Sequence, residues 1–224
     1  MCQRYSLIAE SSELQRRFRM LNLPDAPKAR YNISPTQDVP IVIGGPEERR
    51  IVEARWGLFP FWAKDSVNAD YDSVSGKPVF ERLVKRQRCL VPCSGFYGWK
   101  TEGKSSRAVR FVLPNQGVFA LAGLYEERYD QHRRLHRTCT IMTTMANRLV
   151  AGYDTRMPVI MDETERESWL DPRMTDKRML ANHMYAYPAS LMHAYAITPL
   201  ARDEALETPE VIRELAPDLV LIKK

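Results

Sequence analysis

The middle of the chain constrains the fold most, because its apolar segments have the composition of β-strands. These segments are rich in Val, Phe, Leu, Ile and Thr, and glycines or polar turns separate them, which is typical of strands rather than helices. They cover residues 89–93, 107–113, 118–124 and 137–143. A chain with such a middle section is expected to form a sheet that curls into a barrel-like core.

The segments on either side add helices and a predicted hairpin. Residues 39–43 and 51–56 are strand-like and flank a Gly-Gly-Pro turn, which predicts a hairpin. Pro78 suits the first turn of a helix, and the proline-rich stretch 24–35 is expected to be a loop. Further helices are predicted over 11–23, 162–170, 175–184 and after Pro209, and further strands over 6–9, 194–198 and 219–222. The expected fold is α+β: a single domain over residues 1–224 with a mixed, mostly antiparallel barrel-like sheet and peripheral helices.

Composition indicates a globular protein with a substantial core, since 44% of the residues are hydrophobic and 27% are charged. No apolar run approaches the roughly 20 residues that a membrane span needs, and no signal peptide is visible, so a cytoplasmic location is expected. The four cysteines do not form a disulfide framework. Cys89 and Cys93 suggest a metal site, but no second Cys or His pair follows at zinc-finger spacing. Two buried thiols are therefore favoured, and neither metal nor cofactor is expected.

The charge pattern suits a polyanionic partner, although many proteins without one share it. The net charge is +5 and the isoelectric point is about 9.0. The predicted helix after Pro78 is expected to carry a cationic, mainly solvent-facing set of residues that forms either a solvated face or a seat for phosphates: Arg82, Lys85, Arg86 and Arg88. The chain has no phosphate-binding glycine loop, no Gly-x-Ser-x-Gly elbow and no paired-histidine zinc motif. Its four scattered histidines are expected at the surface.

The N-terminus carries a distinctive pair of reactive groups. Removal of Met1, which is usual before a small residue, makes Cys2 the first residue, with its α-amine and its thiol on adjacent carbons. The amine forms an imine with an aldehyde, and the thiol then closes onto the same carbon to give a thiazolidine ring. Position alone favours an inert terminal cysteine, so only the context of Cys2 supports this chemistry.

Short blocks of polar, aromatic and proline residues recur along the first 161 residues in a fixed order. They are Met-Cys-x-Arg-Tyr at 1–5, Arg-Tyr-Asn-Ile-Ser-Pro-Thr at 30–36, Arg-Trp-Gly-Leu-x-Pro-x-Trp at 55–62, Asn-Ala at 68–69, Arg-Cys-Leu-Val-Pro at 88–92, Gly-Phe-Tyr-x-Trp-Lys at 95–100, Ala-Gly-Leu-Tyr-Glu at 122–126, Thr-Thr at 143–144 and Arg-Met-Pro-Val-Ile at 156–160. Together they resemble the SRAP family, the SOS-response-associated peptidases or abasic-site-processing proteins. The last quarter of the chain matches weakly.

The resemblance implies an α+β protein that binds single-stranded DNA, or junctions with duplex, at abasic sites. Its N-terminal cysteine would capture the aldehyde of the lesion, after an autopeptidase step that removes Met1. The catalytic residues would be Cys2, Asn68 and Asp154, with Asn68 holding DNA or the opened sugar. The DNA-binding residues would be Arg4, Asn32, Pro35, Trp62, Trp99, Lys100, Thr143 and Arg156. We expect a monomer without a membrane partner or cofactor, associated with the nucleoid when DNA-bound.

This chain departs from the family pattern at several polar positions. Gly98 stands where the family usually has a Glu that serves as acid and base, and Asp154 stands where it has a His. Asp70 replaces an Arg, and Gln3 replaces the glycine that usually follows the nucleophile. The asparagines common in the family's C-terminal segment are absent around residues 201–204.

Two hypotheses follow from this combination. In the first, Cys2 still crosslinks abasic sites, with slow or absent reversal because position 98 lacks Glu. In the second, the chain is a catalytically degenerate module that binds DNA structures or a protein partner without covalent chemistry. A protease acting on other proteins has little support, because the sequence shows neither a base nor an oxyanion site for Cys2.

Overall fold

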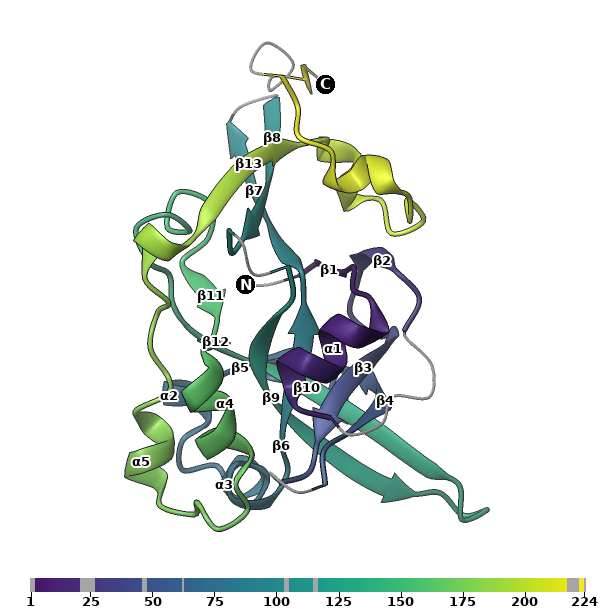
Figure 1. Ribbon diagram of the computed structural model, residues 1–224, viewed down its shortest axis with the longest axis vertical. Helices are drawn as coiled ribbons and strands as arrows, with labels where there is room; N and C mark the ends of the chain where they lie inside the picture. The colour runs from purple at the N-terminus through teal and green to yellow at the C-terminus, as the bar shows by residue number, and fades with distance from the viewer. Residues whose placement is uncertain are drawn as a thin grey trace.

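The core of the protein is a closed β-barrel (Figure 1). The structure is a computed structural model, and it describes residues 3–20, 27–45, 48–61, 63–102, 105–114, 117–216 and 222–223. Around the barrel, each strand pairs with the next in the order β10-β4-β3-β6-β9, and β9 pairs back with β10. Only the β10–β4 step is parallel. The strands are β3 (Asp38–Ile43), β4 (Arg50–Trp56), β6 (Arg88–Cys93), β9 (Phe119–Tyr129) and β10 (Leu135–Met145). The predicted α+β fold with a mostly antiparallel, barrel-like sheet is confirmed.

The barrel interior is packed with side chains that are at most 1% exposed, among them Ile41, Trp56 and Leu121. Cys89 and Cys93 on β6 are also fully buried, as the sequence predicted. Burial raises the pKa of the Cys89 thiol well above its usual range, so this thiol stays protonated.

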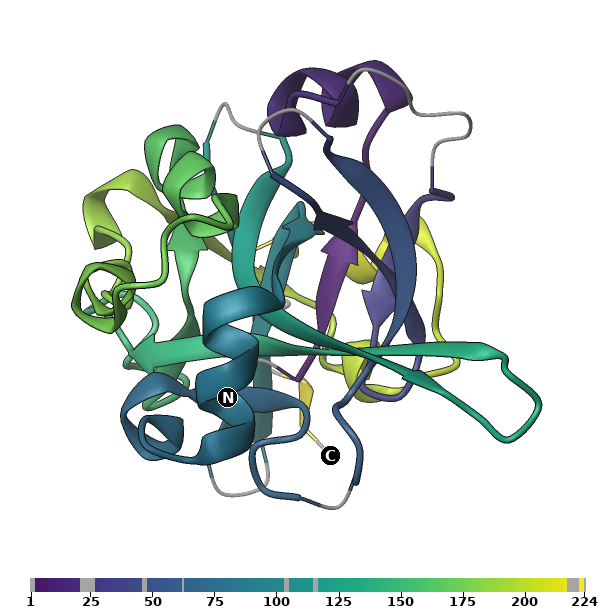
Figure 2. The ribbon, with the colours of Figure 1, turned by 90° about the horizontal axis from the view of Figure 1, so that it is seen from below.

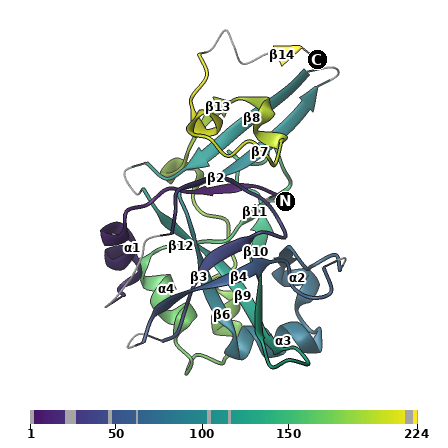
Figure 3. The ribbon, with the colours of Figure 1, turned by 90° about the vertical axis from the view of Figure 1, so that its right-hand side faces the viewer.

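A second, antiparallel sheet holds the N-terminal strand, and Figure 3 shows it above the barrel. The strand β1 lies inside this sheet, between β7 and β2, so that Tyr5 is paired with both Phe96 and Ile33. The first described residues are therefore fixed by backbone pairing on two sides. The strands, in spatial order, are β13 (His193–Ile197), β8 (Ser105–Val112), β7 (Gly95–Glu102), β1 (Tyr5–Leu7) and β2 (Arg30–Ile33), with β14 (Ile222–Lys223) paired to β8.

Two strands of this sheet differ from the sequence prediction. Residues 30–33, expected as part of a loop, form β2 because they pair with β1. Residues 95–102 were not predicted as a strand, since Gly95 and Gly98 lower β-propensity, but β7 pairs with β8 along its full length. In both cases pairing with a partner strand overrides a weak signal within the segment itself.

The helices pack outside the barrel, as Figure 2 shows from below, while the β9–β10 ribbon projects to one side. They are α1 (Ser11–Phe18), α2 (Tyr71–Val74), α3 (Pro78–Arg86), α4 (Glu163–Leu170) and α5 (Lys177–Ala181), with 3₁₀ turns η1 (Ala189–Leu191), η2 (Pro199–Arg202) and η3 (Pro209–Ile212). Helix α3 begins at Pro78 as predicted, whereas α5 is shorter than expected and the helix predicted after Pro209 is only a 3₁₀ turn. The short strands β5 (Asn68–Asp70), β11 (Arg156–Pro158) and β12 (Ile160–Met161) complete the sheet around the barrel. Within the described ranges, no helix has the length and apolarity that crossing a bilayer would require.

An ion pair connects α4 to the start of β4. The side chain of Arg49 is only 2% exposed, and its Nη1 and Nη2 lie 2.9 and 2.5 Å from the Glu167 carboxylate oxygens. The hydrogen bond from Arg49 lowers the pKa of Glu167 below its ordinary value of 4.5. Because the folded-state pKa is depressed, this stabilisation is present above pH 4.5 and is lost as the pH falls through the folded-state value.

Substitution Glu167→Gln is expected to lower the free energy of unfolding by about 1–3 kcal/mol at pH 7, because it removes the charge that compensates a buried guanidinium. The difference from wild type should shrink as the pH falls below 4.5 and disappear below the lowered folded-state pKa, where wild-type Glu167 is protonated as well. Urea unfolding followed by circular dichroism at several pH values measures both effects. A difference that does not depend on pH would contradict the electrostatic origin.

Candidate functional site

A cleft of about 450 Å³ opens beside the N-terminal strand. It is built from the start of the chain, strand β7, the loop before β11 and the turn η2. The lining residues are Gln3, Arg4, Tyr97, Gly98, Trp99, Asp154 and Arg202. Cys2 is bonded to Gln3 but, like Trp62, it lies outside the described residues.

Arg4 is a wall residue of this cleft, and its guanidinium faces the C-terminal segment. Nη1 donates to Oδ1 of Asn32 at 3.2 Å, and Nη2 donates to the carbonyl of Arg202 at 2.8 Å. Nη2 also lies 3.0 Å from Oε1 of Glu204. Neutral acceptors therefore fix the guanidinium, and a carboxylate balances its charge.

Asn32 is fully buried beneath the cleft rather than lining it. Its Nδ2 donates to the carbonyls of Asp203 and Leu206 at 2.8 and 3.0 Å. Asn32 thus supports the cleft by holding the turn over residues 202–207. Pro35, another predicted DNA contact, is half-buried in the turn between β2 and β3 and is not a lining residue of the cleft.

Three predicted residues, Asn68, Thr143 and Arg156, are brought together by neighbouring strands. β5 runs parallel to β10 and pairs Asn68 with Ile141, while β11 pairs with the end of β10. Arg156 Nε lies 3.3 Å from Oγ1 of Thr143, and its Nη2 lies 2.5 Å from Oδ1 of Asp70. Asp70, which replaces the family's Arg, therefore neutralises the charge of Arg156 inside the protein.

A side chain at the position of the missing family Glu would have to displace its neighbours. A Cβ atom at Gly98 would lie 2.8 Å from Cε2 of Phe111 and 3.0 Å from Cβ of Tyr153. The rings of Phe111 and Tyr153 pack edge to face with centroids 5.7 Å apart, so they occupy this space together. Asp154 follows Tyr153 on the same loop and is the only carboxylate among the described residues that line the cleft.

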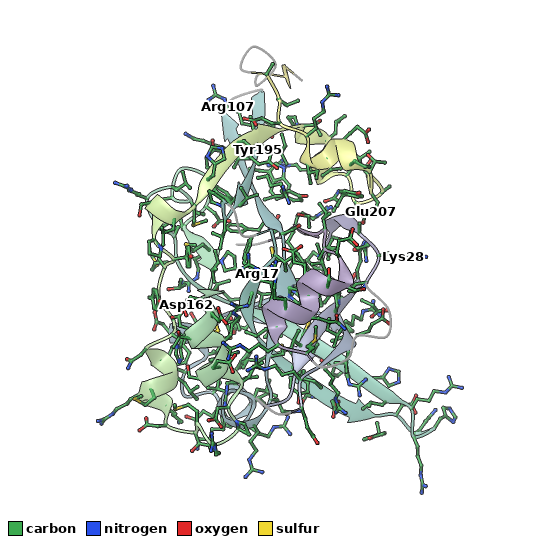
Figure 4. All side chains as sticks on the ribbon, in the orientation of Figure 1. Arg17, Lys28, Arg107, Asp162, Tyr195 and Glu207 are labelled. Carbon is green, nitrogen blue, oxygen red and sulfur yellow. The ribbon has the colours of Figure 1, made fainter. Side chains whose placement is uncertain are left out.

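Aromatic and cationic groups meet at the C-terminal side of the cleft. The Trp99 ring packs edge to face against Tyr97 at 6.1 Å, and the guanidinium of Arg202 lies over Trp99 at 5.9 Å. Lys100 is exposed on the same strand and is paired with Arg107 of β8, which Figure 4 labels. Burial raises the pKa of Tyr97, so its hydroxyl remains a neutral donor, to the carbonyl of Tyr31. Within the described ranges, no group of three or more His, Cys, Asp or Glu is arranged to hold a metal ion.

Comparison with known proteins agrees with the resemblance seen in the sequence. The model of the family described as SOS response associated peptidase (SRAP) matches residues 1–202. The chain belongs to the SRAP family. It is 34% identical to the abasic site processing protein YoqW of Bacillus subtilis, over 95% of this chain and 99% of that protein. It is 25% identical to mouse HMCES, an abasic site processing protein, over 94% of this chain and 71% of that one. A crystal structure of a protein from Bacteroides thetaiotaomicron superimposes with a TM-score of 0.82 at 25% identity, covering 96% of this chain and all of that one.

The SRAP match ends at Arg202, yet the residues that follow hold the N-terminal strands in place. Glu207 accepts hydrogen bonds from the backbone N–H groups of Tyr31 and Asn32 and from Nε of Arg30, the last at 3.1 Å. Figure 4 shows Glu207 between the C-terminal turn and β2. No local sequence pattern predicts these contacts, because about 175 residues separate the partners.

A serine, a histidine and a glutamate also meet outside the cleft. Ser168 Oγ lies 2.8 Å from Nε2 of His183, and Nδ1 of His183 lies 3.7 Å from Glu165. The last distance is too long for a hydrogen bond, and Ser168 Oγ also donates to the carbonyl of Glu165 in its own helix. We therefore assign this cluster to packing α4 against the end of α5. The expected surface position is wrong for His183, which is half-buried, and it is confirmed for the other three histidines.

Proposed function

We propose that this protein captures abasic sites in single-stranded DNA, or at junctions with duplex, through Cys2 after removal of Met1. The observation that carries the proposal is that Gln3, the residue bonded to Cys2, lines a cleft together with two arginines, Trp99 and Asp154. The names of the relatives, abasic site processing proteins, support the same lesion as the target. The protein would act in the cytoplasm, as a monomer, at the nucleoid.

The proposed reaction is a condensation. The α-amine of Cys2 attacks the aldehyde carbon of the ring-opened sugar and releases one water as the imine forms. The thiol then adds across the C=N bond, so that sulfur bonds to the carbon and the proton ends on nitrogen. The product is a thiazolidine, and no oxidant or cofactor is consumed. Holding amine, thiol and aldehyde together supplies several kcal/mol of effective concentration.

Residues that line the cleft and residues on neighbouring strands both have parts in this proposal. Trp99 offers a face for base stacking, and Lys100 and Arg202 offer charges to the DNA backbone. Asn68, which is 4% exposed, would contact the sugar or its neighbouring phosphate beside Arg156, whereas Thr143 is fully buried and would hold Arg156 through its Oγ1 and its carbonyl. Asp154 is the carboxylate available to relay protons during opening of the sugar. With Gly98 in place of Glu, release of the captured DNA is expected to be slow.

A second candidate function is binding of DNA structures without covalent chemistry. The observation that favours it is the internal neutralisation of Arg156 by Asp70 and of Arg4 by Glu204. Both ion pairs reduce the net positive charge that would attract a DNA lesion toward Cys2. This candidate keeps the stacking and phosphate contacts of the cleft and gives Cys2 no role.

The proposal is tested by incubating the protein with a single-stranded oligonucleotide that carries one abasic site and heating the products before a denaturing gel. A heat-stable shifted band is expected. The matched control is the same oligonucleotide after borohydride reduction, which removes the aldehyde and should give no band. Folded protein lacking Met1 that gives no band, but binds an undamaged junction, would contradict capture and support the second candidate.

A further inference from the structure

Glu204 is an exposed counter-charge of Arg4. Its side chain is 66% exposed, whereas that of its partner Arg4 is only 9% exposed. The contact with Arg4 is the one hydrogen bond that the described part of the chain gives this carboxylate. Only the glutamate end of this pair is solvated, so the carboxylate can leave at small cost when another anion takes its place and compensates the buried Arg4.

Arg4 would keep its place without Glu204. The carbonyl of Arg202 and the side chain of Asn32 hold its guanidinium at 2.8 and 3.2 Å. When Glu204 leaves, the Nη2–H group that now donates to it can donate to another acceptor. The position of Glu204 beside Arg4 is therefore one that another anion can take.

The same turn contains a second glutamate, Glu207, whose carboxylate has a structural role. Glu207 is 32% exposed and accepts from two backbone N–H groups as well as from Arg30. Removing its charge would weaken the attachment of the turn to β2. Of these two glutamates, three residues apart, Glu204 is therefore exchangeable and Glu207 is structural.

We propose that Arg4 and Arg202 form a phosphodiester-binding site at the C-terminal edge of the cleft, where a nucleic-acid phosphate replaces Glu204 on Arg4. Both arginines line the cleft, and Arg202 is exposed with its guanidinium over Trp99. A phosphate on Arg4 would thus lie next to the aromatic face on which a base stacks. Glu204 cancels the charge of one of the two arginines, which reduces binding of stray anions. The inference rests on the proposed function for its ligand, single-stranded DNA, but not on the chemistry of Cys2.

The test measures non-covalent binding of an undamaged, fluorescent single-stranded oligonucleotide in a Cys2→Ala background, over a series of salt concentrations. Glu204→Gln preserves the acceptor for Arg4 and removes the competing charge. It is expected to tighten binding about threefold to tenfold at 0.1 M salt and to steepen the salt dependence by about one phosphate contact, a slope change of roughly 0.7. Arg202→Gln is expected to weaken binding to a similar degree, with a shallower slope.

Two control variants separate a specific site from general charge. Glu210→Gln makes the same change in net charge on the exposed η3 turn, and it should leave affinity nearly unchanged. Glu207→Gln should lower thermal stability without a gain in affinity. The proposal is overturned if Glu204→Gln binds no tighter than its parent, or if Glu210→Gln gains as much.

The outcome is independent of covalent capture. Tighter binding by Glu204→Gln, together with no heat-stable band from the wild type, would leave the phosphate site standing and remove the capture function. A band from the wild type with no effect of Glu204→Gln would do the reverse. Absence of binding by every variant would overturn this inference.

Discussion

A Cys2→Ala variant is expected to form no heat-stable adduct with an abasic oligonucleotide, a loss of at least about a hundredfold relative to wild type. Alanine is also small, so Met1 should still be removed and the α-amine should still be free. The amine alone gives only an imine, which water reverses on heating. Without sulfur, the second bond to the aldehyde carbon cannot form.

A chemical trap and a second variant test whether the sulfur of Cys2 accounts for the difference between Cys2→Ala and wild type. Borohydride added during the reaction should convert the imine of Cys2→Ala into a stable amine, so that a band appears only when the trap is present. Cys2→Ser keeps the shape of the side chain but has a poorly nucleophilic hydroxyl, and it should behave like Cys2→Ala. Full adduct formation by either variant without borohydride would show that another nucleophile captures the lesion.

A Gly98→Glu variant is expected to unfold more easily than wild type, by about 1–3 kcal/mol or more, and not to gain the reversal chemistry of a carboxylate at this position. The reason is steric. The new Cβ would lie 2.8 Å from Phe111 and 3.0 Å from Tyr153, and both neighbours are held by packing. Urea unfolding measures the loss, and the midpoint should move without a change in slope.

Gly98→Ala isolates the Cβ contact from the charge of Glu and should account for most of the loss. The double variant Gly98→Ala with Phe111→Leu should lose less than the sum of the single variants, because the smaller side chain removes the closer contact. Gly98→Ala that is as stable as wild type would show that the site has room. In that case the missing Glu would be a matter of chemistry and not of packing.

Local sequence signals predicted the elements that depend on local contacts. The hairpin of β3 and β4 and the helix that begins at Pro78 were predicted nearly to their ends. Strand β2 was not, because it forms by pairing with β1 at the distant N-terminus, and β7 was not, because it forms by pairing with β8 and β1. The sheet closes into a barrel where β9 pairs with β10, and no single segment of the sequence encodes this closed topology.

In the candidate site, too, the sequence predicts what depends on one residue and misses what depends on distant partners. The chemistry of Cys2 follows from its covalent structure and needs no fold. The surroundings of Arg4 do not, since its partners Arg202 and Glu204 are 198 and 200 residues away. The neutralisation of Arg156 by Asp70 also spans 86 residues, and a sequence shows only that the two charges have opposite sign.

The most direct test of covalent capture is the mass of the N-terminal tryptic peptide after reaction of the wild-type protein with an abasic oligonucleotide and nuclease digestion. The proposal predicts the peptide Cys2-Gln3-Arg4, without Met1, carrying the sugar remnant less one water, with both the thiol and the α-amine blocked. An unmodified N-terminal peptide, with the sugar remnant on another residue or on none, would contradict it.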